Sequence, residues 1–324
     1  MVATALLAGS LTGCGASSTT TSSVSISVEN CGERLSLDEP PKRVTVLDSA
    51  SIPTLHRLGV FDRIGARAGL YPAEYYDAEL NAALSEVSSL TERVDATGHL
   101  QISAETVVAT APDLVLGQSD TVNRRTLATA GIEVIDEPAF CGSLDHDASF
   151  ADVWSQIRTY GKVFDRAGRA EEYIDELSGQ LESLTSDVPN GHADSPTVAV
   201  LYPTLGGGST YAYGRRSMSN PVVEAAGLDN VFSDTADRVF EVTGEELVAR
   251  DPDFIIALHS DGSPADVRSA VGQIPGIGAV TALREEAVLP LLLGFAEPPT
   301  PLAVDGLEKV HTFVSAHNRA EVRR

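Results

Sequence analysis

One segment of the sequence occurs twice, and this repetition constrains the fold more than any other feature. Residues 103–116 read SAETVVATAPDLVL and residues 243–256 read TGEELVARDPDFII. In each copy a hydroxyl residue can cap a short helix, a glutamate occupies its first turn, a proline ends it and an apolar strand follows. Each glutamate lies seven residues before its proline. We therefore expect two lobes built alike, with Glu105 and Glu245 in equivalent places.

Short apolar strands alternate with helical segments on both sides of one long helical stretch. Apolar runs at 44–47 and 114–116 in the first half, and at 198–201 and 254–257 in the second, are typical of buried strands. Strands that alternate with helices indicate a parallel α/β sheet. Between the halves, residues 149–184 carry apolar residues at helical spacing and no strand pattern. The expected order is an α/β lobe, a long helix and a second α/β lobe.

This interpretation divides the chain into four segments. A length of 324 residues is comfortable for two domains. We expect a signal and tether over residues 1–27, an N-terminal lobe over 28–148, a linker helix over 149–187 and a C-terminal lobe over 188–324.

The N-terminus has the features of a bacterial lipoprotein. Leu11-Thr12-Gly13-Cys14 resembles a lipobox, in which small residues let a signal peptidase cut before a cysteine that then carries lipid. Residues 15–23 are almost all Ser and Thr, as in a flexible tether. No Lys or Arg precedes Cys14, although a signal peptide begins with one, so we expect the natural start to lie upstream. A chance match in an alanine-rich start is the alternative.

Charge and cysteine content narrow the class of protein. The formal net charge of −23 repels nucleic acid, and no stretch of about 20 apolar residues follows the N-terminus, so we expect no membrane span in the body. If Cys14 carries lipid, Cys31 and Cys141 remain as an even pair in an oxidising compartment. A Cys31–Cys141 disulfide is the natural proposal, and two buried free thiols are the alternative.

Several short motifs, in order along the chain, resemble the iron-siderophore and cobalamin family of ABC transporter substrate-binding proteins. The similarity runs from about Val28 to the C-terminus. The motifs are Asn30-Cys31-Gly32, Pro40-Pro41-Lys42-Arg43-Val44, Leu58-Gly59-Val60, Pro112-Asp113-Leu114-Val115 and Ala225-Ala226-Gly227-Leu228-Asp229-Asn230-Val231.

The resemblance implies both a fold and a role. It implies two Rossmann-like α/β lobes joined by a single long helix, with the ligand held between the lobes. It implies a lipid-anchored extracytoplasmic protein that captures a ferric siderophore and delivers it to an ABC permease; heme or cobalamin is the alternative ligand. It also places permease-docking glutamates at Glu105 and Glu245, with Glu246 adjacent. The alternative for both glutamates is that they only stabilise helix starts.

Ligand-binding candidates follow from a general rule for parallel sheets. Ligands bind beyond the carboxyl ends of the strands. Siderophores are often anionic, so arginines can neutralise their oxygens while aromatic rings cover their apolar faces. Arg and Tyr concentrate in the loop 210–216, for which an ordinary surface loop is the alternative. The candidates are Arg67, Tyr71, Tyr75 and His99 in the first lobe, and Tyr211, Tyr213, Arg215, Arg216 and Arg238 in the second; Asp48, Ser49 and Tyr202 also follow strands.

Enzymes are the rival class, for example an anchored α/β hydrolase. The sequence contains no G-x-S-x-G, H-E-x-x-H or C-x-x-C pattern, and its seven histidines lack metal-ligand spacing. We therefore expect no catalytic residues, no metal site and no cofactor, with iron present only inside a bound chelate. A structural surface protein is the third class, but it would not need Arg and Tyr gathered at strand ends.

Overall fold

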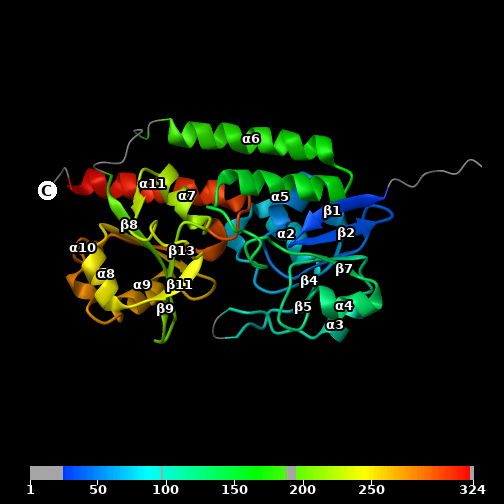
Figure 1. The fold of residues 1–324 in the computed structure, drawn as a ribbon, viewed down its shortest axis with the longest axis horizontal. Helices are drawn as coiled ribbons and strands as arrows, with labels where there is room; N and C mark the ends of the chain where they lie inside the picture. Colours follow the sequence, from blue (N-terminus) through cyan, green and yellow to red (C-terminus); the bar gives the residue numbers. More distant parts are fainter. Residues whose placement is uncertain (1–24, 96–97, 187, 189–194, 322–324) are drawn as a thin grey trace, which may run out of the picture.

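The computed structural model describes residues 25–95, 98–186, 188 and 195–321. They form two α/β lobes, which confirms the predicted fold class (Figure 1). The N-terminal lobe has a five-stranded parallel sheet of order β5-β4-β3-β6-β7 and a separate hairpin, β1-β2. Its strands are β1 (Ile26–Asn30), β2 (Glu33–Leu37), β3 (Val44–Val46), β4 (Ile64–Ala68), β5 (Ser88–Thr91), β6 (Leu114–Leu116) and β7 (Glu133–Ile135). Its helices, with η for 3-10 helices, are α1 (Ile52–Arg57), η1 (Phe61–Arg63), η2 (Ala73–Tyr75), α2 (Ala78–Ser85), α3 (Ala104–Val108), α4 (Arg124–Leu127) and η3 (Ala128–Ala130).

The C-terminal lobe is built on a mixed sheet of order β11-β9-β8-β12-β13, with β10 added to β8. Strands β8, β12 and β13 are parallel, whereas β9 is antiparallel to both β8 and β11. Its strands are β8 (Thr197–Pro203), β9 (Thr210–Tyr213), β10 (Asp229–Asn230), β11 (Val239–Val242), β12 (Phe254–His259) and β13 (Val288–Leu292). Its helices are α7 (Ser219–Ala225), α8 (Gly244–Arg250), α9 (Pro264–Gly272), η4 (Ile277–Ala279), α10 (Thr281–Arg284), η5 (Leu293–Phe295) and α11 (Leu302–Glu321).

The segment between the lobes differs in detail from one continuous helix. It consists of α5 (Phe150–Val163) and α6 (Ala167–Thr185), which pack against each other along one side of the molecule (Figure 1). The chain turns at Asp165, whose φ of 54° lies in the left-handed region and ends the helix. Gly161 allows the two helices to approach closely, because a Cβ there would collide with Ala170. The linker is therefore a helical hairpin.

The repeated segment has the same structure in both lobes. Ser103 and Thr243 cap α3 and α8 by accepting a hydrogen bond from the backbone three residues on, at 3.3 and 3.2 Å. Glu105 and Glu245 occupy the first helical turns and are exposed. The equivalence predicted from the sequence is confirmed. Figure 1 shows α3 and α8 in different lobes, both on the side of the molecule away from α6.

A disulfide joins Cys31 to Cys141, as predicted, with the two cysteines 110 residues apart. It ties the β1-β2 hairpin to the loop that follows β7. One continuous apolar core extends through both lobes and the helical hairpin, and Tyr160 and Phe164 of the hairpin are fully buried in it. The lobes therefore share an interior. Cys14 and the tether lie outside the described residues, and in the part that the structure describes no helix is long and apolar enough to cross a membrane.

Candidate functional site

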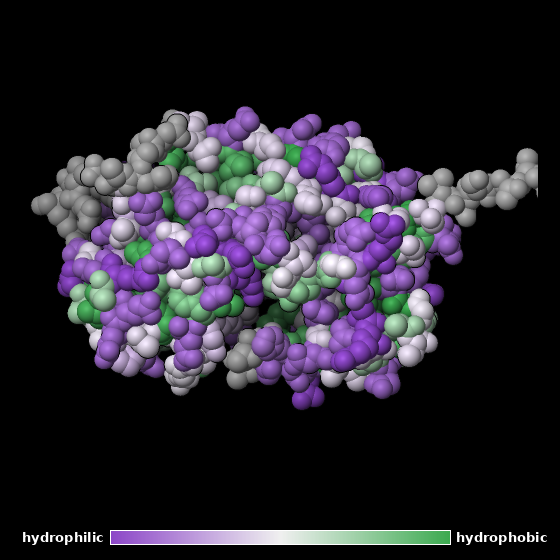
Figure 2. Space-filling model, in the orientation of Figure 1, coloured by the Kyte–Doolittle hydropathy of each residue, from purple (hydrophilic) through white to green (hydrophobic). Residues whose placement is uncertain are grey.

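A cleft between the lobes contains two adjoining cavities, and Figure 2 shows the molecule hollowed there. The inner cavity has a volume of about 170 Å³ and the outer one about 390 Å³. Leu70, Pro72 and Ser260 line both, so the two are neighbouring parts of one site. Both are lined by residues of the two lobes, which is the arrangement expected for a ligand held between them.

The ends of the strands supply the wall of the inner cavity. Asp48 and Ser49 follow β3, Phe140 follows β7, and Leu293 and Gly294 follow β13. Each of these strands belongs to a parallel part of its sheet, so their carboxyl ends face the cleft together.

Asp48 places a carboxyl group in the wall of the inner cavity. Its Oδ1 accepts a hydrogen bond of 2.9 Å from the backbone of Ala50. Burial raises the pKa of this carboxyl to about 6, against the smaller opposing effect of that hydrogen bond. Gly117, at the end of β6, has a φ of 86° and leaves room for the carboxyl, because a Cβ there would overlap Oδ2. Position 117 therefore favours glycine for two reasons: its positive φ, and the lack of space for a Cβ beside the Asp48 carboxyl group.

Arg67 and Tyr71 form one wall of the outer cavity. The guanidinium carbon of Arg67 lies 5.2 Å from the centroid of the Tyr71 ring, and its Nη1 lies 3.4 Å from the exposed carboxylate of Glu92. The Arg67 Nε is buried and has no hydrogen-bond partner in the described part of the chain. The Tyr71 hydroxyl lies within 3.2 Å of two backbone carbonyls, those of Val46 and Ala68. The Arg67 side chain is only 15% exposed and lines the outer cavity with the part of the guanidinium that stays accessible.

Tyr75 connects the two lobes at the back of the inner cavity. Its hydroxyl accepts a hydrogen bond of 2.7 Å from the backbone N–H of Gly294, and its ring packs edge-on against Phe295 at 5.0 Å. Burial raises the pKa of the Tyr75 hydroxyl above its usual range, so the group stays neutral. Tyr75 therefore sets how closely the lobes approach at this point.

A second contact between the lobes involves a loop of the N-terminal lobe. Val94 and Leu100 pair as an antiparallel bridge, and both line the inner cavity. Between them Gly98 lies so close to the C-terminal lobe that a Cβ there would be 3.6 Å from the hydroxyls of Tyr202 and Ser260. His99, on the same loop, is exposed and lies 3.6 Å from Asp95. Val94, Gly98 and Leu100 therefore form part of the wall of the inner cavity.

Phe140 is a cavity residue that the sequence analysis did not single out. It is one of the exposed large apolar residues, at 39%, and the guanidinium carbon of Arg238 lies 5.7 Å from its ring centroid. Arg238 Nη1 in turn donates a hydrogen bond of 2.9 Å to the fully buried carboxylate of Glu297. The other oxygen of Glu297 accepts from the backbone of Met218 at 2.6 Å. The charge of Arg238 is thus matched inside the protein.

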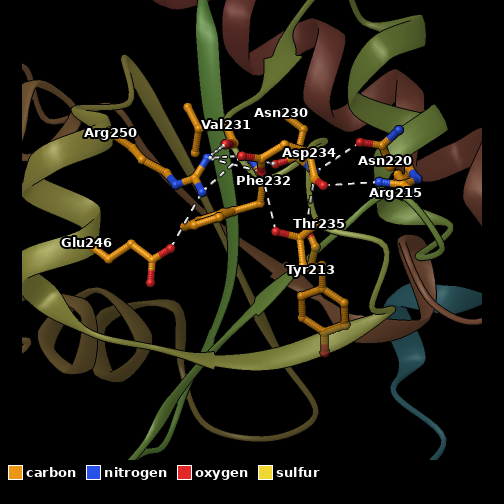
Figure 3. Close-up of polar contacts among 10 residues, drawn as sticks. All are labelled: Tyr213, Arg215, Asn220, Asn230, Val231, Phe232, Asp234, Thr235, Glu246 and Arg250. Carbon is orange, nitrogen blue, oxygen red and sulfur yellow. Dashed lines mark hydrogen bonds and ion pairs between the residues drawn. The ribbon is translucent and has the colours of Figure 1, made fainter.

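The Arg- and Tyr-rich loop is placed differently from Arg67 and Tyr71. Arg215 pairs with Asp147 at 2.9 Å and donates to the backbone carbonyl of Asp234 at 3.1 Å, near the Arg250 ion pairs (Figure 3). Tyr213 is buried, and Tyr211 and Arg216 are half-buried. None of these four lines either cavity, and neither does His99. Their role as ligand contacts stays a prediction, whereas Arg67, Tyr71 and Tyr75 are brought together at the cleft.

The same strand-end rule could have found the residues that were missed. Phe140 lies a few residues beyond β7, and Leu293 and Gly294 directly follow β13. Pro298, which follows a buried glutamate rather than a strand, carries no such signal.

Comparison with known proteins identifies the family. The model of a family described as "Periplasmic binding protein" matches residues 44–291, which is most of the chain and includes both lobes. The chain belongs to the periplasmic binding protein family. Members of this family are solute-binding transport proteins rather than enzymes, and the cleft between the lobes is consistent with that role.

Individual members of the periplasmic binding protein family are similar to this chain over most of their length. A structure titled "ABC-type Fe3+-hydroxamate transport system" from Saccharomonospora viridis is 46% identical, with a TM-score of 0.84, 89% of this chain covered and 98% of that one. A cobalamin-binding protein of Halobacterium salinarum is 25% identical, over 85% of this chain and 70% of that protein. YvrC of Bacillus subtilis, named an uncharacterized ABC transporter substrate-binding lipoprotein, is 22% identical, over 85% of this chain and 81% of that protein.

Proposed function

We propose that this periplasmic binding protein captures a ferric hydroxamate chelate in the cleft between its lobes and delivers it to an ABC permease. The observation that carries the proposal is the combination of the cleft with 46% identity to a protein titled for Fe³⁺-hydroxamate transport. The cleft has what such a chelate needs: aromatic and apolar faces from Tyr71, Phe140 and Leu293, and the guanidinium group of Arg67 in the wall of the outer cavity.

The charge of the cleft favours a neutral or cationic chelate. Four side chains that line the two cavities carry charge, and three of them are acidic: Asp48, Glu92 and Asp261 against Arg67. The pKa of Asp48 is raised only to about 6, so it is mostly ionised at neutral pH. Like charges in a desolvated site repel a bound anion strongly. This differs from the arginine-rich cleft that the sequence led us to expect, since Arg215 and Arg238 are paired within the protein.

A ligand panel tests the proposal. We expect tight binding of ferrichrome, a neutral trihydroxamate, and of ferrioxamine B, a cationic one, measured by quenching of the Trp154 and tyrosine fluorescence. A ferric tris-catecholate, which is strongly anionic, should bind at least about 100-fold more weakly. Arg67→Gln should weaken hydroxamate binding about tenfold because it removes a charged donor from the wall. Binding of the catecholate alone would contradict the charge argument.

Cobalamin is the second candidate, because two of the curated relatives are named cobalamin-binding proteins. Cyanocobalamin and hemin therefore belong in the same panel. Tight binding of cyanocobalamin with no response to either hydroxamate would replace the iron chelate by cobalamin as the cargo.

Anchoring and delivery complete the proposed role. We expect Cys14 to carry lipid, as the lipobox and the similarity to a named lipoprotein support. Cys14→Ala, expressed from the natural upstream start, should release the protein from the membrane fraction. Glu105 and Glu245, exposed at matched helix starts, should dock the two lobes on the permease. The double variant Glu105→Gln/Glu245→Gln should lose uptake in cells while its affinity for the chelate in solution stays unchanged.

A further inference from the structure

The exposed apolar side chains of the described residues show an unexpected regularity. Four large apolar residues are exposed there: Val108 at 37%, Phe140 at 39%, Val239 at 37% and Val248 at 37%. Phe140 belongs to the cleft. Val108 and Val248 occupy the same position in the two copies of the repeated segment, three residues after Glu105 and Glu245 respectively. Two of the four exposed residues are therefore a matched pair, one on each lobe.

Helix geometry places each valine beside its glutamate. Residues three apart lie on the same side of a helix, so Glu105 and Val108 share one face of α3, and Glu245 and Val248 share one face of α8. The residue before each valine, Val107 or Leu247, is fully buried and holds the helix on its lobe. Each lobe thus presents a carboxylate and an apolar side chain side by side on a helix that is fixed from beneath.

We propose that Val108 and Val248 are the apolar half of the permease-docking surface, and that each inserts into an apolar site beside the basic group that receives the neighbouring glutamate. The inference rests on the proposed function, because it names the ABC permease as the partner. The reason for choosing this partner is the duplication. Two equal acid-plus-valine patches, one on each lobe, fit a partner that presents the same surface twice, as a permease with two-fold symmetry does.

The two kinds of side chain contribute differently to docking. Exposed carboxylates mainly speed encounter and set register, and salt screens their effect. Apolar contact is little affected by ionic strength and mainly slows dissociation. The docked state should therefore keep a salt-resistant component that the glutamates cannot supply.

Uptake in cells provides the first test. Cells of the native host that lack the gene are complemented with the wild type, Val108→Ser/Val248→Ser, Glu105→Gln/Glu245→Gln, or Val239→Ser. Val239, on β11, is the matched control because it has the same exposure of 37%. We expect the valine pair to reduce the uptake rate of iron-labelled ferrioxamine B about tenfold, with normal protein level and normal chelate affinity in solution. Val239→Ser should transport like the wild type.

Photocrosslinking in the same cells provides the second test and does not depend on the identity of the chelate. A photoreactive phenylalanine replaces Val108, Val248 or Val239, and the crosslinked protein is identified by mass spectrometry. We expect positions 108 and 248 to crosslink to the transmembrane subunits of one ABC permease, with yields that persist in high salt, and position 239 not to do so.

The outcomes separate the inference from the proposed function. If the glutamate pair lowers uptake but the valine pair does not, and positions 108 and 248 form no crosslink to the permease, the valines are ordinary surface residues and the inference is wrong. If neither pair affects uptake and no permease is crosslinked at any position, delivery to a permease itself is contradicted. A loss of uptake in Val239→Ser equal to that of the valine pair would also overturn the inference, because any exposed valine would then suffice.

Discussion

The two lobes are alike in their surface framework and unlike in how they bury acidic groups. Asp113 and Asp253 occupy matched places, and each accepts hydrogen bonds from the backbone at the start of the neighbouring strand. The N-terminal lobe buries Asp136 and Glu137. Among the described residues, both carboxylate oxygens of Asp136 and one of Glu137 have no hydrogen-bond partner. The C-terminal lobe holds Glu297, which is fully buried but paired with Arg238. The repeated segment therefore has the same backbone contacts in both lobes, whereas the pairing of buried acidic groups differs between them.

The largest expected difference in stability between the lobes comes from the disulfide, because Cys31 and Cys141 both belong to the N-terminal lobe. Replacing both by Ser removes a crosslink between residues 110 apart, which we expect to cost about 4 kcal/mol in free energy of unfolding. Denaturant titration measures the loss. Hydrogen exchange should locate it around β1, β2 and the loop after β7, with β8 and β12 little changed. Equal loss of protection in both lobes would mean that the lobes unfold as one unit.

Acid burial in the N-terminal lobe predicts an unusual dependence of stability on pH. Burial, together with the nearby Asp48, raises the pKa of Glu137 from 4.5 to about 8 and that of Asp136 from 3.8 to about 7. The folded protein then binds more protons than the unfolded chain between about pH 4 and 8. The contribution of these groups to stability is fully present below about pH 4 and is lost as the pH rises through their pKa values in the folded protein.

Calorimetry at a series of pH values checks this dependence. The melting temperature should fall from mildly acidic to mildly alkaline pH, and Glu137→Gln should flatten the fall because the side chain no longer ionises. Glu137 accepts a hydrogen bond of 2.8 Å from Tyr160, which the amide oxygen of Gln can still accept. A profile that rises with pH over this range would show that the buried carboxyls are ionised and compensated in the folded protein.

The Arg238–Glu297 pair is the counterpart in the C-terminal lobe. Among the described residues, Arg238→Leu leaves the buried carboxylate of Glu297 with the backbone N–H of Met218 as its hydrogen-bond donor. We expect a loss of about 2 kcal/mol, below the usual cost for a fully buried pair because the Arg238 side chain is 28% exposed. The double variant Arg238→Leu/Glu297→Gln should recover part of this loss in denaturant titrations. No recovery would show that the arginine acts through its contact with Phe140 instead.

Asp113 and Asp253 allow the most direct comparison of the lobes. Asp113 accepts from the backbone of Lys42 and Arg43 at 2.9 to 3.1 Å, in an exposed setting. Asp253 accepts from the backbone and the hydroxyl of Thr197, both at 2.8 Å, in a partly buried one. We expect Asn at position 253 to cost about 1 kcal/mol and Asn at position 113 somewhat less. The reverse order in thermal unfolding would contradict the argument that the partly buried contacts of Asp253 contribute more than the exposed ones of Asp113.

The sequence predicted the parts of the fold that depend on local patterns. The caps, the glutamates and the strands of the repeated segment are local, so Ser103 and Thr243 were found correctly, and the count of cysteines led to the Cys31–Cys141 pair. The break in the linker was missed because Asp165 turns the chain without a Gly or Pro to mark it.

The cleft was harder to predict because it depends on partners far apart in the sequence. Arg238 pairs with Glu297, 59 residues away, and Arg215 with Asp147, 68 residues away. No local pattern reveals either pairing. An arginine at a strand end can therefore serve the protein or a ligand, and spacing alone does not distinguish the two. Arg67, near the end of β4, and Tyr71, three residues beyond it, do line the outer cavity, as the strand-end rule predicts, and their contact with a ligand stays a prediction.

The hydrogen bond between Tyr75 and Gly294 has a consequence for how a ligand enters. It joins the lobes across a site whose inner cavity, at about 170 Å³, is smaller than the roughly 300–1,000 Å³ that encloses a typical bound small molecule. A chelate that extends from the outer cavity into a space larger than the present inner cavity would have to part the lobes at this point, which breaks the bond. Every tenfold preference of the empty protein for the shut form lowers the apparent affinity tenfold. Tyr75→Phe should raise the association rate of the ligand more than it changes the dissociation rate. One hydroxyl group at the back of the inner cavity would then control how fast the protein binds its ligand.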